Sequence, residues 1–148
     1  MKISDIITVD SIALSVKAKN KRQLLQELSQ LATTITNVSE RTIFDILLER
    51  ENLGSTGFGG GVAIPHGRLA ELNKVHGFFI KLATTLDYNS IDGKPVDMIF
   101  LLLSPESNGA DHLTALAHIS RLLKDNSMVS KLREATDKEE IYALLSNS

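Results

Sequence analysis

Residues 54–68 read Gly-Ser-Thr-Gly-Phe-Gly-Gly-Gly-Val-Ala-Ile-Pro-His-Gly-Arg, with five glycines in the eleven residues before Pro65. So many glycines disfavour a helix or an ordinary strand, because each one loses much backbone entropy on folding. The stretch therefore predicts a loop whose N–H groups approach a ligand, then a short buried strand at 62–64 that Pro65 ends. Glycine amides beside an imidazole and guanidinium groups suit an anionic phosphoryl group as that ligand.

Regular elements are expected before this stretch. Alternating apolar residues indicate a strand at 12–16, and apolar residues at helical spacing indicate a helix over 22–35. A second helix is predicted to start after Ser39, a good N-cap residue, and to end near Leu53. Gly54 then serves as its C-terminal glycine, so the loop follows directly from a helix end.

Strands and helices also follow the glycine-rich stretch. Strands are predicted at 75–83 and 96–103, and the second is apolar on both faces, which is typical of a central strand. A helix is expected over 110–124, and Asp137 with Glu140 forms a capping-box pattern for a last helix. Because strands and helices intermix along the chain, we expect a layered α/β fold.

Composition limits the function classes. The 148 residues fit one ordinary domain spanning 1–148, and 43% hydrophobic with 23% charged residues is typical of a globular fold. A net charge of -2 argues against a nucleic-acid coat protein, and the lack of cysteine excludes disulfides and thiol chemistry. There is no signal-peptide pattern, and the longest apolar run, Met98 to Leu103, is too short to enter a membrane, so we expect a cytoplasmic protein.

Two common nucleotide-binding motifs do not fit the glycines. A P-loop requires a Gly-Lys-Ser/Thr ending that is absent, and a dinucleotide fingerprint read from Gly57 and Gly59 would need glycine where Val62 stands. A metal site built on His66 and His112 lacks a carboxylate at ligand spacing. We therefore expect neither a metal nor a cofactor.

His66 is the candidate nucleophile. A single histidine is often only a polar surface residue, but Pro65 stiffens the backbone before this one and Gly67 leaves space after it. A neutral imidazole can attack phosphorus without the help of a separate base. This setting favours a phosphohistidine over an ordinary surface histidine.

Groups that would stabilise a phosphoryl group stand on both sides of His66. The amides of Gly59, Gly60 and Gly61 can donate to its oxygens, and the guanidinium groups of Arg50 and Arg68 can pair with them. Arg50 falls in the last helical turn before the loop, which favours a functional position. Arg68 fits a solvated surface charge equally well.

The other histidines differ in their surroundings. His112 follows Ser107-Asn108-Gly109 in the first turn of its predicted helix, where free N–H groups also favour an anion. It is the candidate for holding the phosphoryl group or orienting the nucleophile. His118 is expected on an exposed helix face, and His76 has no chemically suggestive neighbours in the sequence.

Three segments together resemble a known family. Residues 54–57, 63–68 and 111–116 (Asp-His-Leu-Thr-Ala-Leu) are similar to the active-site signatures of the fructose/mannitol-type IIA domains of the bacterial phosphoenolpyruvate:sugar phosphotransferase system. The resemblance implies a mixed β-sheet flanked by helices on both faces. It implies that Nε2 of His66 accepts the phosphoryl group, that His112 helps to hold it, and that Arg50 is the active-site arginine. The implied donor is a phosphorylated HPr-type carrier, charged by Enzyme I from phosphoenolpyruvate.

Within this family, the chain resembles the nitrogen-related branch in two features. Residues 54–57 read Gly-Ser-Thr-Gly, and no IIB or IIC part is fused to the IIA domain. That branch is regulatory, and its phosphorylation state controls binding to partners such as potassium-uptake proteins and sensor kinases. One alternative is a sugar-specific IIA component that passes the phosphoryl group to a IIB domain. Another is a binding module that has lost its chemistry, although the presence of His66, His112 and Arg50 counts against it.

Overall fold

Strand β6 (Val96–Pro105) is the centre of the fold, as its two apolar faces predict. In the computed structural model, which describes residues 1–148, it pairs with strands on both of its edges. Its side chains alternate between two buried clusters, with Phe100 and Leu102 in one and Leu101 and Leu103 in the other. This alternation divides the hydrophobic core into two layers, one on each face of the sheet.

The sheet has six strands and is mixed. Their order is β1-β5-β6-β3-β2, and β4 also pairs with β6. Strand β5 runs antiparallel to β6, and β3 and β4 run parallel to β6 along its other edge. β1 is parallel to β5, and β2 is antiparallel to β3. The bounds are β1 (Ile12–Val16), β2 (Gly57–Gly59), β3 (Val62–Ala63), β4 (His66–Leu69) and β5 (His76–Leu86).

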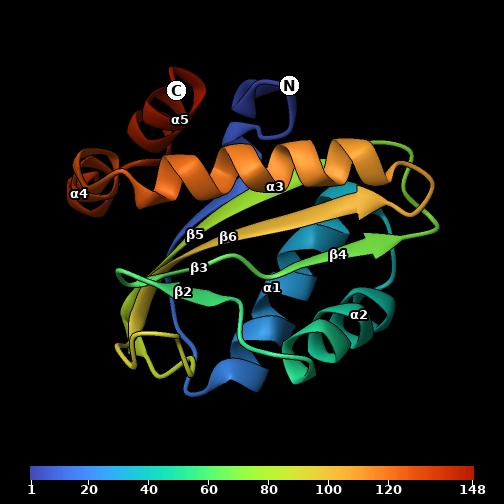
Figure 1. Cartoon of the computed structure of the whole chain (residues 1–148), viewed down its shortest axis with the longest axis horizontal. Helices are drawn as coiled ribbons and strands as arrows, with labels where there is room; N and C mark the ends of the chain where they lie inside the picture. Colours follow the sequence, from blue (N-terminus) through green and yellow to red (C-terminus); the bar gives the residue numbers. More distant parts are fainter.

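Helices cover both faces of the sheet, as expected (Figure 1). Helices α1 (Lys21–Thr36) and α2 (Glu40–Asn52) pack on one face and contribute to one buried cluster. The opposite face is covered by α3 (Gly109–Lys124), α4 (Asn126–Glu134) and α5 (Lys138–Ser146), with the short 3₁₀ helices η1 (Ile3–Asp5) and η2 (Val9–Ser11). No helix combines the length and the apolar composition that crossing a membrane requires.

The strand predicted at 62–64 ends before Pro65, as β3 (Val62–Ala63), but the strand that follows Pro65 was not predicted. Pro65 interrupts the strand, but its carbonyl still accepts a hydrogen bond from the N–H of Leu102 at 3.0 Å. The chain then resumes pairing with the same edge of β6 as β4, so that His66 is aligned with Leu102. A proline removes only the donor of its residue, and this edge needs only the acceptor at that position. The interruption places His66 at the start of a strand.

Two further elements were not predicted. Part of the glycine-rich stretch pairs as β2, and the turn that follows it uses positive φ angles at Gly59, Gly60 and Gly61. Helix α4 is short and largely polar, and its N-cap is Asp125, whose carboxylate accepts from the N–H groups of Ser127 and Met128. Its three apolar residues, Met128, Val129 and Leu132, do have helical spacing, but a stripe of three residues was overlooked.

Candidate active site

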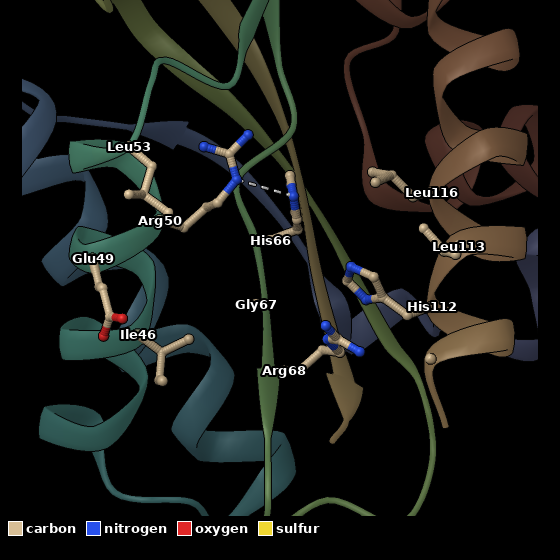
Figure 2. A pocket seen from close by; sticks show the side chains of 11 residues that line it. Ile46, Glu49, Arg50, Leu53, His66, Gly67, Arg68, His112, Leu113 and Leu116 are labelled. Atoms are coloured by element: carbon tan, nitrogen blue, oxygen red, sulfur yellow. Dashed lines mark hydrogen bonds between the residues drawn. The ribbon is translucent and has the colours of Figure 1, made fainter. Parts of the chain in front are cut away.

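A cleft of about 490 Å³ opens between α2, β4 and α3 (Figure 2). Figure 2 shows α2 on one side carrying Arg50, β4 on the floor carrying His66 and Arg68, and α3 on the other side carrying His112. The lining combines these four basic or imidazole side chains with an apolar rim. The remaining lining residues are Ile46, Glu49, Leu53, Gly67, Gly109, Leu113 and Leu116.

His66 is held in one tautomer by its neighbours. Its Nδ1 lies 2.8 Å from the carbonyl oxygen of Ile64, and the Nε of Arg50 lies 3.3 Å from its Nε2. A carbonyl only accepts, so Nδ1 carries the hydrogen, and Nε2 of the neutral ring accepts from the Arg50 N–H. Burial lowers the pKa of His66 below 6.5, and the Arg50 charge lowers it further. The imidazole is therefore neutral near pH 7, with its lone pair on Nε2, where it accepts from Arg50.

Arg50 is fixed at both ends of its guanidinium group. It lies in the last turn of α2, as predicted, and its Nη1 donates to the carbonyl oxygen of Gly54 at 2.8 Å. The same side chain donates from Nε to His66. It forms no ion pair with a carboxylate, so its charge is available to an anion at Nε2 of His66.

His112 faces His66 across the cleft from the first turn of α3. The ring centroids are 5.6 Å apart, and only 7% of the His112 surface is exposed. Its Nδ1 lies 2.7 Å from the hydroxyl oxygen of Ser104 near the end of β6. Burial lowers the pKa of His112 to about 4, helped by the charges of His66 and Arg68. When the Ser104 hydroxyl donates to Nδ1, the neutral ring carries its hydrogen on Nε2 and can donate it to a ligand.

The Ser104 contact was not predicted. The serine directly follows the apolar run that ends at Leu103, and nothing in the sequence marked it as functional. It is fully buried. A hydroxyl near the end of a buried strand, shortly before a helix that carries a histidine, is the signal that would have pointed to it. Buried hydroxyls are normally hydrogen-bonded, so such a serine needs a polar partner nearby.

Arg68 also reaches the cleft. It lies two residues after His66 in β4 and therefore on the same face of the strand. Its Nη1 packs against the first residue of α3, where a Cβ added to Gly109 would lie 3.1 Å away. Like Arg50, it forms no ion pair. The cleft therefore contains two guanidinium groups without a carboxylate partner, which favours an anionic ligand.

The glycines predicted to bind phosphate lie elsewhere. Gly59, Gly60 and Gly61 form the turn between β2 and β3, and none of them lines the cleft. The N–H of Gly60 donates to the Asp92 carboxylate at 3.1 Å, and the carbonyl of Gly60 accepts from Arg133 at 3.2 Å. The turn needs glycine because its φ angles are +105°, +68° and +81°, which other residues rarely adopt.

The two remaining histidines also lie outside the cleft. His118 contacts the carbonyl oxygen of Met1 through Nδ1 at 3.2 Å, and the ring of His76 stacks on that of Phe78. No three His, Cys, Asp or Glu side chains come together as a metal site would require. The sequence predictions that the structure brings together are therefore Arg50, His66, Arg68 and His112.

Comparisons with known proteins show the family of this chain. Residues 5–148 match the family model described as phosphoenolpyruvate-dependent sugar phosphotransferase system, EIIA 2. A nitrogen regulatory protein of Bradyrhizobium diazoefficiens is 48% identical over 145 residues, which cover 98% of this chain and 95% of the relative. The crystal structure of nitrogen regulatory protein IIA-Ntr from Neisseria meningitidis superposes with a TM-score of 0.92 at 36% identity, covering 97% and 98% of the two chains. A fructose-specific EIIA component of Haloferax volcanii is 33% identical over 149 residues, covering 98% of this chain and 97% of the relative.

Proposed function

The chain belongs to the EIIA 2 family of the phosphoenolpyruvate-dependent sugar phosphotransferase system, and from that premise we propose that it is a nitrogen-related phosphocarrier whose His66 accepts the phosphoryl group. One observation carries the proposal. Nε2 of a neutral His66 carries its lone pair into the cleft and is bonded only to the N–H of Arg50 at 3.3 Å, an arginine that forms no ion pair and can move its hydrogen bond to an arriving phosphoryl oxygen. That is the arrangement a nucleophilic nitrogen needs at an electrophilic phosphorus.

The transfer is a displacement at phosphorus. The lone pair of Nε2 forms the new nitrogen–phosphorus bond, and the bond between phosphorus and the donor atom breaks with its electron pair going to the donor. The hydrogen stays on Nδ1 and keeps its bond to the Ile64 carbonyl, so the ring gains a positive charge as the nitrogen–phosphorus bond forms. Arg50 and Arg68 stabilise the charge on the three phosphoryl oxygens, and Nε2–H of His112 donates to one of them. Phosphoryl transfer needs mainly this alignment and charge stabilisation from the protein.

The donor in this proposal is a phosphorylated HPr-type carrier protein. The rim of the cleft suits a protein partner, because Leu53 on one side is 81% exposed and Leu113 on the other is 67% exposed. Exposed leucines around a polar centre are typical of a protein–protein interface. A partner that docks on both leucines would bring its own phosphorylated side chain over His66.

The output in this proposal is regulatory. Phosphorylation places a phosphoryl group that carries about 1.5 to 2 negative charges in a cleft with an apolar rim. Such a charge changes which partner proteins can bind to the rim, and it requires no change of fold. The 48% identical relative named as a nitrogen regulatory protein supports this branch. We therefore expect regulatory partners such as potassium-uptake proteins or sensor kinases. The alternative is a sugar-specific IIA component that passes the phosphoryl group to a IIB domain, which the fructose-specific relative supports at 33% identity.

A phosphorylation assay tests the proposal. The protein is incubated with phosphoenolpyruvate, Enzyme I and an HPr-type carrier, and its intact mass is measured under non-acidic conditions, beside His66→Ala and His112→Ala. We expect one added phosphoryl group in the wild type, none in His66→Ala, and slower transfer in His112→Ala. An unchanged wild-type mass would contradict the proposal. Rapid onward transfer to a purified IIB domain, followed by sugar phosphorylation, would favour the sugar-specific alternative.

A further inference from the structure

Glu51 is a buried carboxylate directly after Arg50, and nothing above assigns it a role. Only 2% of its side chain is exposed. We propose that Glu51 is a positioning residue for the phosphoryl transfer, because its carboxylate fixes both the Arg50 end of α2 and the segment that holds His66. The inference rests on the proposed function of His66.

The Glu51 carboxylate accepts from four donors. Oε2 accepts from Nζ of Lys21 at 3.1 Å and from the N–H of Thr56 at 3.2 Å. Oε1 accepts from the Tyr88 hydroxyl at 2.8 Å and from the Thr56 hydroxyl. Lys21 also lies over the Tyr88 ring, 4.2 Å from its centroid. A buried carboxylate with this many partners is rigidly held, because losing any one of them leaves a polar atom unsatisfied.

One path of hydrogen bonds leads from Glu51 to the nucleophile. The N–H of Thr56 donates to Glu51, and the carbonyl of Thr56 accepts from the N–H of Ile64 at 3.0 Å. The carbonyl of Ile64 in turn accepts from Nδ1 of His66 at 2.8 Å. At Thr56 and Ile64 the N–H and the carbonyl belong to different peptide groups. The path therefore holds His66 in position. It does not transmit polarisation from Glu51 to His66, because no single peptide group joins two successive hydrogen bonds.

A second connection runs to Arg50. The residue next to Glu51 in the last turn of α2 is Arg50, and the N–H of Gly54 closes the turn on the Glu51 carbonyl at 3.1 Å. The carbonyl of Gly54 then accepts from Nη1 of Arg50 at 2.8 Å. Arg50 is therefore tied to the backbone of Glu51, and His66 is tied to the Glu51 carboxylate, so their 3.3 Å contact depends on where Glu51 is held.

The main test is Glu51→Gln. Glutamine keeps the shape of the side chain but loses the negative charge that pairs with Lys21, and its NH₂ group donates where the second oxygen accepted from the Thr56 and Tyr88 hydroxyls. We expect the phosphorylation rate at saturating donor to fall about 10- to 100-fold, because a small misalignment of reacting groups is costly. The KM for the donor should stay within about twofold, since the apolar rim is unchanged.

Two hydroxyl variants provide a matched comparison. Thr56→Val and Tyr88→Phe each remove one hydroxyl donor to Oε1 of Glu51. The Thr56 hydroxyl also anchors the segment whose backbone leads to Ile64 and His66, so its loss lets that segment shift, whereas Tyr88→Phe leaves the segment anchored. We expect Thr56→Val to slow phosphorylation more than Tyr88→Phe at a similar loss of thermal stability. If the network had only a structural role, the phosphorylation rate of each variant would fall in proportion to its loss of thermal stability. This pair tests the inference even where Glu51→Gln does not fold.

A spectroscopic measurement separates this inference from the proposed function. Imidazole ¹⁵N shifts report whether His66 carries its hydrogen on Nδ1, and they need no phosphoryl donor. We expect a single Nδ1–H tautomer in the wild type and a mixture in Glu51→Gln. A folded Glu51→Gln with the wild-type tautomer and the wild-type rate would overturn the inference. A wild type that is not phosphorylated would overturn the proposed function, and the tautomer would still decide the role of Glu51.

Discussion

Gly67 and Ile46 are packed so closely that a Cβ on Gly67 would lie 2.5 Å from Cγ2 of Ile46. Gly67 directly follows His66 in β4, and Ile46 lies one helical turn before Arg50 in α2. The contact therefore sets the spacing between α2 and β4. Because Arg50 lies on α2 and His66 on β4, it also sets the distance between their side chains. Gly67 has no positive φ, so the glycine is needed here for space.

Gly67→Ala is expected to push α2 away from β4. Overpacking of this kind lowers the free energy of unfolding by about 1–3 kcal/mol. We also expect slower phosphorylation of His66, because Arg50 moves with the helix. Chemical denaturation and the phosphorylation rate measure the two effects. Gly109→Ala is the matched control for stability on the other side of the cleft, since its methyl would meet only the flexible end of the Arg68 side chain at 3.1 Å. An equal loss of stability in the two variants would contradict this account.

The sequence was sufficient to predict the layers of the fold and the main side chains of the cleft. The two-sided apolar pattern of 96–103 identified the central strand, and the helix end near Leu53 placed Arg50 in the last turn of α2. The histidines His66 and His112 lie on elements that are 46 positions apart in the sequence, and the resemblance to known motifs linked them. Their 5.6 Å separation depends on how α3 packs over β6.

The glycine-rich turn shows where local reasoning fails. A glycine is required both for a positive φ angle and for close approach of a ligand, and a sequence does not distinguish these two needs. At Gly59, Gly60 and Gly61 the first need applies, because the turn joins β2 to β3 away from His66. Glu51 was missed for a different reason. A glutamate near a helix end is usually exposed, and its burial depends on Tyr88 and Lys21, which are distant in the sequence.

Stability should fall as the pH is lowered from about 6.5 towards about 4, because His112 titrates near 6.5 when unfolded and at about 4 when folded. In that range the unfolded chain binds a proton that the folded protein does not, so acid favours unfolding. His112 contributes a slope of at most about 1.4 kcal/mol per pH unit. His66 and His76 act in the same direction, since burial lowers their pKa values too. Urea denaturation at several pH values measures the slope, and His112→Gln should reduce it. A slope unaffected by that substitution would refute the assignment.

Leu113→Glu should weaken docking of the phosphorylated donor without slowing the chemical step. Leu113 is 67% exposed on the rim, so the substitution costs little stability, but it places a charge where an apolar contact is expected. We expect the KM for the donor to rise by about tenfold or more, with the rate at saturation within about twofold. Ile91→Glu is the control, because Ile91 is 83% exposed but lies outside the cleft. If both variants raise KM equally, the rim is not the docking surface.

Phosphorylation of His66 should raise the pKa of His112. In the unmodified protein, burial and the positive charges of His66 and Arg68 hold that pKa at about 4. A phosphoryl group on Nε2 of His66 would place about 1.5 to 2 negative charges close to the His112 ring. Opposite charges within about 4–6 Å favour the charged form and shift a pKa by about 1–3. His112 would then bind a proton at a pH where the unmodified protein does not, and its imidazolium would hold the phosphoryl group more strongly.

An NMR titration of the His112 ring in the phosphorylated and unmodified proteins measures this change. The range from pH 8 to 5.5 keeps the phosphohistidine intact long enough to record spectra and still detects the rise. His76 is the internal control, because it lies outside the cleft and its pKa should be the same in both states. Identical His112 titrations in the two proteins would mean that the phosphoryl group does not lie beside this ring. The donor role proposed for Nε2–H of His112 would then have to be abandoned, while that of Arg50 would stand.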